Sequence, residues 1–194
     1  MTCEEKKREL RKIARRADAA LDDGYRRNSD REIARRLLAL REYAEATCLF
    51  CFVSTPREIE TRAIIEDALG AGKRVCVPLC TGEGEMEARE IRSLEELREG
   101  AFGISEPPAE APRVPVDEID FAVIPCLACN HAGVRLGRGG GYYDRFLAQY
   151  RGGAVLLCRE LLIRDEIPAQ THDCPVPWVL TERALYEDGV PAQG

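Results

Sequence analysis

The sequence predicts an α/β protein: a mostly parallel sheet with helices on both faces, an α/β/α sandwich, preceded by an amino-terminal helical hairpin. Two observations carry this prediction. Short apolar runs alternate along the chain with helix-like segments, and capping boxes precede several of those segments. Such alternation is typical of a parallel sheet covered on both faces. At 194 residues the chain is long enough to bury about 70% of its unfolded surface, so we expect residues 1–194 to form a single domain.

Two helices are predicted at the amino terminus. The first has an apolar stripe over residues 10–21 and stops at residues 22–24, which read Asp-Asp-Gly. The second is predicted to begin at a capping box formed by Ser29 and Glu32, with its apolar stripe over residues 33–44. We expect the two helices to form a hairpin.

Strands and helices alternate over the rest of the chain. The predicted strands cover 47–53, 73–77, 86–91, 121–125, 154–158 and a last segment around Val179. Four helices are predicted between these strands. The first begins at a capping box of Thr55 and Glu58 and ends at Gly70, and the second begins at Ser93 with Glu96. The third runs from Tyr142 to about Tyr150, and the fourth from Leu161 to Glu166. Residues 107–115 are predicted to be a proline-rich loop.

The carboxyl ends of the predicted strands indicate where a ligand would bind. In parallel sheets, ligands bind beyond these ends. The loops after Val53, Pro125 and Cys158 are therefore expected to open on one edge. That edge would bring Glu58 and residues 133–145 to a common cleft.

Charge and hydropathy exclude several classes of protein. The net charge is −6, with +5 over residues 1–41 and −11 over the remainder. The basic segment is either a localised anion site or a solvated helix face. Because the pI is about 5.2 and no aromatic residues interleave the basic stretch, nucleic acid is not expected as a partner. No run approaches the roughly 18 apolar residues of a membrane span, and basic residues interrupt 1–21, so we expect a cytoplasmic protein without membrane contact.

Nine cysteines raise the question of a metal or a disulfide. Cys48 and Cys51 lie in one predicted strand at an odd separation, which places them on opposite faces of the sheet. Cys126 and Cys129 have the spacing of metal ligands, but no nearby pair completes a zinc site. We therefore expect reduced thiols that serve as small core residues.

Residues 133–145, Gly-Val-Arg-Leu-Gly-Arg-Gly-Gly-Gly-Tyr-Tyr-Asp-Arg, are the main candidate for function. Glycines let backbone N–H groups approach an anion, and the helix predicted at Tyr142 adds its positive end. The segment matches neither the P-loop nor the dinucleotide fingerprint. Asp144 suits an anion site only if a cation lies between it and the phosphates. The structural alternative is a surface turn with Tyr142 and Tyr143 as core aromatics.

Residues 135–144 closely resemble the signature of the 5-formyltetrahydrofolate cyclo-ligase family, also called methenyltetrahydrofolate synthetase. Residues 7–11 resemble the family's amino-terminal nucleotide contact, 58–61 its substrate-side segment, and 172–173 its late His-Asp element. The resemblance runs in order from about Lys7 to Thr181.

The resemblance implies that ATP and Mg²⁺ drive cyclisation of 5-formyltetrahydrofolate to 5,10-methenyltetrahydrofolate, with release of ADP and phosphate, through phosphorylation of the formyl oxygen. It implies catalytic roles for Arg138, Tyr142 and Asp144, and Mg²⁺ binding by Asp144 and Asp173. It implies ATP binding by Lys7, Arg8, Glu9, Leu10, Arg11, Arg135, Leu136, Gly137, Arg138, Gly139, Gly140, Gly141, Tyr142 and Tyr143. It implies substrate binding by Val53, Glu58, Arg138, Gly139, Gly140, Gly141 and Tyr142. A monomer is expected.

The chain also departs from the family pattern. Residues 125–131 replace a Pro-Gly and Phe-Asp stretch, and Pro177 stands where the family commonly has aspartate. Two other functions stay open: a non-catalytic nucleotide- or folate-binding paralogue, and a sugar-phosphate isomerase-like enzyme. The isomerase would work without ATP and would need a general base near the sugar. The only histidines, His131 and His172, are candidates for this base, but the sequence assigns neither of them a partner.

Overall fold

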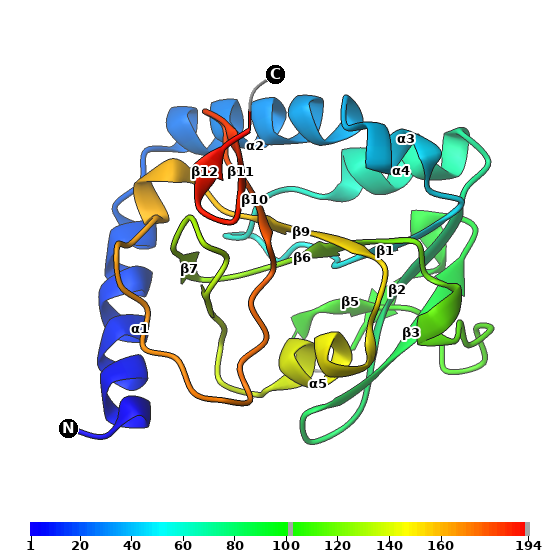
Figure 1. Cartoon of the computed structure of the whole chain (residues 1–194). Coiled ribbons are helices and arrows are strands. Elements are labelled where there is room, and N and C mark those ends of the chain that lie inside the picture. Colours follow the sequence, from blue (N-terminus) through cyan, green and yellow to red (C-terminus); the bar gives the residue numbers. More distant parts are fainter. Residues whose placement is uncertain (101–102, 193–194) are drawn as a thin grey trace.

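A computed structural model describes residues 1–100 and 103–192, and the main sheet within these ranges has eight strands in the order β12-β11-β10-β9-β6-β1-β2-β3 (Figure 1). The strands are β1 (Cys48–Cys51), β2 (Arg74–Gly82), β3 (Glu85–Ile91), β6 (Phe121–Ile124), β9 (Gly153–Leu157), β10 (Trp178–Leu180), β11 (Leu185–Glu187) and β12 (Val190–Pro191). The central strands from β10 to β2 pair in parallel, and β3, β11 and β12 join antiparallel at the edges. The predicted mostly parallel sheet is confirmed.

Five α-helices and several short elements surround this sheet in the described part of the chain. The helices are α1 (Cys3–Ala19), α2 (Asp23–Leu38), α3 (Arg41–Glu45), α4 (Arg62–Gly70) and α5 (Tyr142–Gln149). The 3-10 turns are η1 (Leu94–Glu96), η3 (Val116–Glu118) and η4 (Glu160–Leu162). Two small antiparallel pairs are β4 (Arg98–Glu99) with β5 (Ser105–Glu106), and β7 (Ala128–Cys129) with β8 (Arg135–Leu136). None of the helices in the described ranges has the length and apolar composition that crossing a membrane requires.

The alternation of side chains along the strands builds two apolar layers. Cys51 belongs to the layer that packs against α2, α3 and α4, whereas Cys48 and Phe50 belong to the layer that packs against α5. Phe50 stacks on Phe146 of α5 with ring centroids 4.5 Å apart. The opposite orientation of Cys48 and Cys51 and the helices on both faces are thus confirmed.

The amino-terminal helices follow one another as expected, but each packs on a different partner. Helix α1 has a capping box formed by Thr2 and Glu5, and its Ala14 packs with Ala128 and Leu136 of the β7–β8 hairpin. Helix α2 packs on the sheet. Figure 1 shows α1 along one side of the molecule at a wide angle to α2. This arrangement leaves one face of α1 toward the glycine-rich loop.

The predicted start of the second helix is wrong. Helix α2 begins at Asp23, because the Asp22 carboxylate accepts hydrogen bonds from the N–H groups of Gly24 and Tyr25. Ser29 lies inside the helix, where it is buried and its hydroxyl donates to the Arg26 carbonyl. An earlier cap therefore took precedence over the capping-box pattern.

Three further predicted helices are shorter than expected. Thr55 and Glu58 do bond to one another, since the Thr55 N–H donates to Glu58 Oε2 at 2.9 Å, but they close a turn and α4 begins only at Arg62. The Ser93 segment forms one 3-10 turn before β4. The segment 161–166 is helical only as η4, because the Arg164 N–H donates to the Cys129 carbonyl instead of continuing a helix. The interpretation of residues 1–194 as one domain stays a prediction.

Candidate functional site

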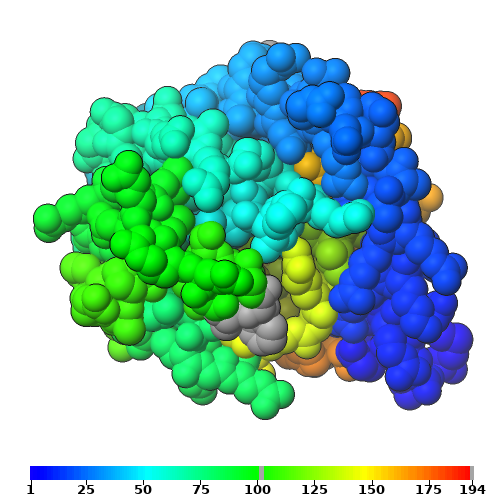
Figure 2. All heavy atoms as spheres, turned by 180° about the vertical axis from the view of Figure 1, so that it is seen from behind, coloured from blue at the N-terminus to red at the C-terminus, as the bar shows by residue number. Residues whose placement is uncertain are grey.

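A hollow lies between α1 and the body of the protein, as Figure 2 shows, with the region around residues 125–145 visible at its floor. Within it is a pocket of about 50 Å³. Its walls include Phe52 after β1, Pro125 and Cys126 after β6, and Leu157 and Cys158 at the end of β9. The carboxyl ends of three neighbouring parallel strands therefore meet at one pocket, which confirms the predicted edge.

Residues 137–141 connect the β7–β8 hairpin to α5. Gly139 has φ 110° and Gly141 has φ 73°, conformations that L side chains rarely adopt. Gly141 is the N-cap of α5 and makes no side-chain capping bond, so the first N–H groups of this helix are available to an anion. The sequence-predicted helix start at Tyr142 is confirmed.

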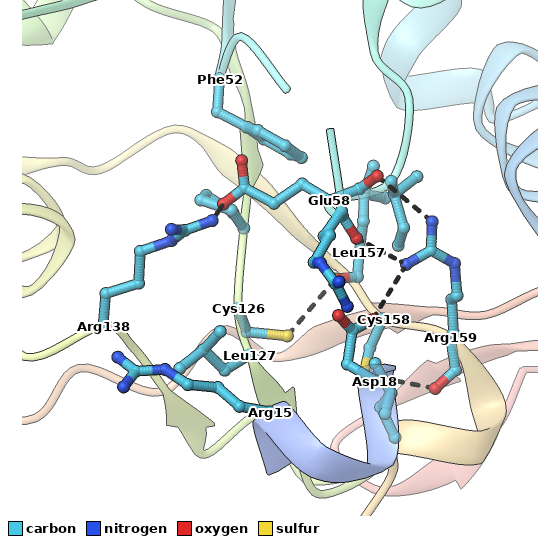
Figure 3. A pocket seen from close by; sticks show the side chains of 14 residues that line it. Arg15, Asp18, Phe52, Glu58, Cys126, Leu127, Arg138, Leu157, Cys158 and Arg159 are labelled. Atoms are coloured by element: carbon cyan, nitrogen blue, oxygen red, sulfur yellow. Dashed lines mark hydrogen bonds and ion pairs between the residues drawn. The ribbon is translucent and has the colours of Figure 1, made fainter. Parts of the chain in front are cut away.

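Arg138 joins the glycine loop to the opposite wall of the pocket. Its Nη2 lies 2.9 Å from Glu58 Oε1 (Figure 3) and 3.0 Å from Thr55 Oγ1. The Arg138 side chain is 53% exposed and that of Glu58 16%, so the cation reaches from solvent onto a largely covered carboxylate. The expected meeting of Glu58 and the 133–145 loop is confirmed.

Lys7 and Arg11 extend from one face of α1 toward the loop. Arg11 Nε donates to the Gly137 carbonyl at 3.0 Å, and its Nη1 pairs with Glu4 at 2.8 Å. Lys7 is buried, with Nζ 2.6 Å from Asp173 Oδ2. The i, i+4 spacing thus places both cations beside the segments that the sequence singled out. Of the residues between them, Arg8 and Glu9 are exposed, and Leu10 packs against the apolar cluster under α1.

The two candidate metal ligands lie on adjacent segments. Asp144 Oδ1 is 2.8 Å from Arg135 Nη2 and accepts the N–H of Cys174, the residue after Asp173. Burial opposes ionisation of Asp173, but the Lys7 ammonium and the Gln170 N–H hold the pKa of its carboxyl below its usual range. Carboxylate oxygens are the donors that Mg²⁺ prefers, so these residues fit the ion in chemistry. In this structure each carboxylate is paired with a cation, Asp144 with Arg135 and Asp173 with Lys7.

Other predicted site residues have clear structural positions. Tyr142 is half-buried and its hydroxyl donates to the Gly82 carbonyl, while burial raises the pKa of Tyr143, which packs against both apolar layers. Leu136 is buried beneath α1. Val53 is buried in the core, and its neighbour Phe52 lines the pocket instead.

Arg159 is a pocket residue that sequence reasoning missed. It is 3% exposed, and its Nη2 lies 2.6 Å from Asp30 Oδ1. The guanidinium also donates to the carbonyls of Arg57 and Glu58, at 3.0 and 3.2 Å, and so holds the turn that carries Glu58. Burial raises the pKa of Asp30 despite this partner. The signal in the sequence that could have identified Arg159 as a pocket residue was its position just after the carboxyl end of a predicted strand. Arg15 and Asp18 of α1 also line the pocket.

The departures from the family pattern fall at two places. Pro125, Cys126 and Leu127 form part of the pocket wall, so this departure does change the surface that a substrate meets. Pro177 is exposed, just before β10, and its carbonyl accepts the N–H of Asp188.

Comparisons with known proteins agree with one another. A family model described as the 5-formyltetrahydrofolate cyclo-ligase family matches residues 3–182. An Escherichia coli protein named 5-formyltetrahydrofolate cyclo-ligase is 27% identical over 181 residues, which cover 90% of this chain and 100% of the relative. A Mycolicibacterium smegmatis protein of that name is 31% identical over 140 residues, covering 68% of this chain and 72% of the relative. The solved structure of Aquifex aeolicus 5,10-methenyltetrahydrofolate synthetase is 28% identical, with a TM-score of 0.84 over 97% of this chain and 95% of that one.

Proposed function

This chain belongs to the 5-formyltetrahydrofolate cyclo-ligase family, and on that premise we propose that it closes 5-formyltetrahydrofolate to 5,10-methenyltetrahydrofolate, using Mg²⁺ and ATP and releasing ADP and phosphate. One observation carries the proposal. The glycine loop ends in a left-handed N-cap at α5 and carries Arg138, which reaches Glu58 across the pocket. In the proposal, the phosphate site and the folate site therefore share one arginine.

The chemistry explains why ATP is required. The oxygen of a formamide is a poor leaving group, so direct attack of nitrogen 10 on the formyl carbon does not complete ring closure. Transfer of the γ-phosphoryl group to that oxygen, with ADP as the leaving group, converts it into a phosphate ester. Nitrogen 10 then attacks the carbon and loses its proton, and the phosphate departs with the C–O bonding pair.

The residues of this chain supply position and charge for that transfer, which is most of what phosphoryl-transfer catalysis needs. In the proposal, residues 7–11 and 135–143 bind ATP, with Lys7, Arg11 and Arg135 as the cations. Arg138, which contacts both walls, neutralises charge on the transferring group. Glu58, Tyr142 and the glycines 139–141 orient the folate. Asp144 and Asp173 would hold Mg²⁺, which supplies further neutralisation of the phosphates.

The test is the absorbance of the methenyl product after protein, Mg-ATP and 5-formyltetrahydrofolate are mixed. We expect product only when ATP and Mg²⁺ are both present. Binding of both substrates without product would identify a non-catalytic paralogue and refute the enzyme assignment. Turnover of a sugar phosphate without ATP would instead support the isomerase-like alternative. A monomeric state and a cytoplasmic location stay part of the proposal.

A further inference from the structure

Three cysteines that are separated in sequence meet behind the pocket. The Sγ atoms of Cys126, Cys129 and Cys158 all lie within 4.8 Å of one another. Cys126 follows β6, Cys129 ends β7 and Cys158 follows β9. The first two have the spacing of metal ligands, but no neighbour in sequence completes a site with them. The third sulfur comes from the segment after β9, which lies beside the segment after β6 because β6 and β9 are parallel neighbours that pair Ile124 with Leu156.

The cluster differs from an ordinary set of core thiols in its position. Cys129 is fully buried. Cys126 and Cys158 line the pocket, although Cys158 is only 2% exposed. Figure 3 shows the Cys126 sulfur directed toward the end of β9, where it lies 3.4 Å from the Leu157 carbonyl. All three thiols are free. The sulfurs therefore converge on one point at the edge of a space open to solvent.

The separations fit a thiophilic metal ion. At a Zn–S distance of about 2.3 Å, the sulfurs of a tetrahedral or trigonal site lie about 3.8–4.0 Å apart. Sulfurs that lie within 4.8 Å of one another are already close to this spacing. Among the described residues, no fourth His, Cys, Asp or Glu belongs to this group. Three soft ligands without a carboxylate favour Zn²⁺ or Cu⁺ over Mg²⁺, so the cluster is chemically separate from the Asp144 region.

We propose that Cys126, Cys129 and Cys158 form a Zn²⁺ site in which three thiolates hold the ion and the fourth position opens to the pocket. Binding would cross-link the segments after β6 and β9 and the β7 strand. These segments carry part of the pocket wall, so the ion would stabilise that wall. The proposal does not depend on the cyclo-ligase activity, since its tests measure metal binding alone.

The test uses the full-length protein, reduced and freed of metal with a chelator. Titration with Co²⁺ is expected to give thiolate-to-cobalt charge-transfer absorption that saturates at one equivalent, and one equivalent of Zn²⁺ is expected to abolish it. Cys126→Ser should weaken Zn²⁺ binding by at least about 100-fold, because a ligand to the ion is lost. Cys80→Ser, at another half-buried cysteine outside the cluster, should bind like the wild type.

Several results would overturn the proposal: no thiolate absorption with Co²⁺, equal affinity in Cys126→Ser and Cys80→Ser, or a disulfide within the cluster that persists under the reducing conditions. Preference for Cu⁺ with no measurable Zn²⁺ binding would also reject it. If Cys126→Ser fails to fold, zinc X-ray absorption of the wild-type protein decides. Three sulfur neighbours support the site, and a shell of only nitrogen and oxygen rejects it.

Discussion

At the residue scale, Arg138 is the side chain that joins the glycine loop to the Glu58 wall. Its planar guanidinium suits contact with both a carboxylate and phosphate oxygens. Arg138→Ala is expected to lower kcat by about 100-fold, the cost of removing one donor to developing charge, with a smaller change in the KM for folate. Initial rates with each substrate varied give both constants. Arg138→Lys keeps the charge, so its kcat should lie between those of the wild type and Arg138→Ala. An effect confined to the KM for folate would contradict a role of Arg138 in the phosphoryl transfer.

Asp144 is the other residue whose role can be isolated. Its carboxylate is the expected Mg²⁺ ligand and also pairs with Arg135. Asp144→Asn should raise the Mg²⁺ concentration needed for half-maximal rate at least about tenfold, because a neutral amide binds the ion less well than a carboxylate. Rates over a Mg²⁺ series at fixed ATP measure this. Asp165→Asn, at an exposed acid outside the site, is the control, and an unchanged Mg²⁺ requirement in Asp144→Asn would refute the metal role.

At the element scale, the start of α5 depends on Gly141. A Cβ there would combine φ 73° with a 2.9 Å contact to the Arg145 guanidinium. Gly141→Ala should reduce the free energy of unfolding by about 1–2 kcal/mol, the cost of a left-handed L residue. Gly137→Ala is the matched control, because a Cβ on Gly137 would meet nothing within 4 Å and the φ of this residue is not positive. Denaturant unfolding compares the two, and equal losses would contradict the conformational argument.

The starts of β1 and β6 are joined by one carboxylate. Asp120 Oδ2 accepts the Thr47 hydroxyl at 2.6 Å and the N–H groups of Thr47 and Cys48 at 2.8 Å. The Thr47 hydroxyl and these N–H groups hold the pKa of Asp120 below its usual range. A depressed folded-state pKa stabilises the protein above the unfolded value of about 3.9, and the stabilisation is lost as pH falls from there through the folded pKa.

Asp120→Asn tests this linkage. At pH 7 the variant should be less stable than the wild type by about 1 kcal/mol, the usual worth of such hydrogen bonds. The difference should shrink as pH falls below about 4, since the wild-type carboxyl is then protonated. Unfolding curves from pH 7 to 2 provide the measurement, with Asp117→Asn on the exposed neighbouring turn as control. A difference that stays constant with pH would show that charge at Asp120 is not the cause.

At the scale of the whole molecule, Arg159 connects α2, the Glu58 turn and the end of β9. Arg159 is buried and the Asp30 side chain is 17% exposed, so Arg159→Met would leave a largely covered carboxylate without its partner and should cost up to about 3 kcal/mol of stability. Adding Asp30→Asn should recover part of the loss. Thermal and denaturant unfolding measure both variants, and exposed Arg183→Met is the control. If the second substitution recovers nothing, the loss is one of packing rather than charge.

The elements that were predicted well are those whose cause is local. Strand periodicity, the helix start after the glycine loop and the opposite faces of Cys48 and Cys51 follow from residues near one another in sequence. The helix predicted from Thr55 to Gly70 begins only at Arg62, and the Ser93 segment forms one 3-10 turn. The helix predicted over 161–166 is helical only as η4, because a tertiary hydrogen bond competes with it. In that bond, Arg164 donates its N–H to the Cys129 carbonyl.

Local patterns were enough to predict the fold class, the family resemblance and the loop expected to meet phosphate, because glycine conformation, helix capping and apolar periodicity act over a few residues. The groups that meet from distant parts of the chain could not be predicted in this way: Arg138 with Glu58, Lys7 with Asp173, Arg159 with Asp30, and Cys158 with Cys126 and Cys129. These pairings depend on strand order and on how α1 and α2 pack against the rest of the protein. Neighbouring strands in a parallel sheet are joined by long crossover connections, so side chains far apart in sequence come together at the same sheet edge.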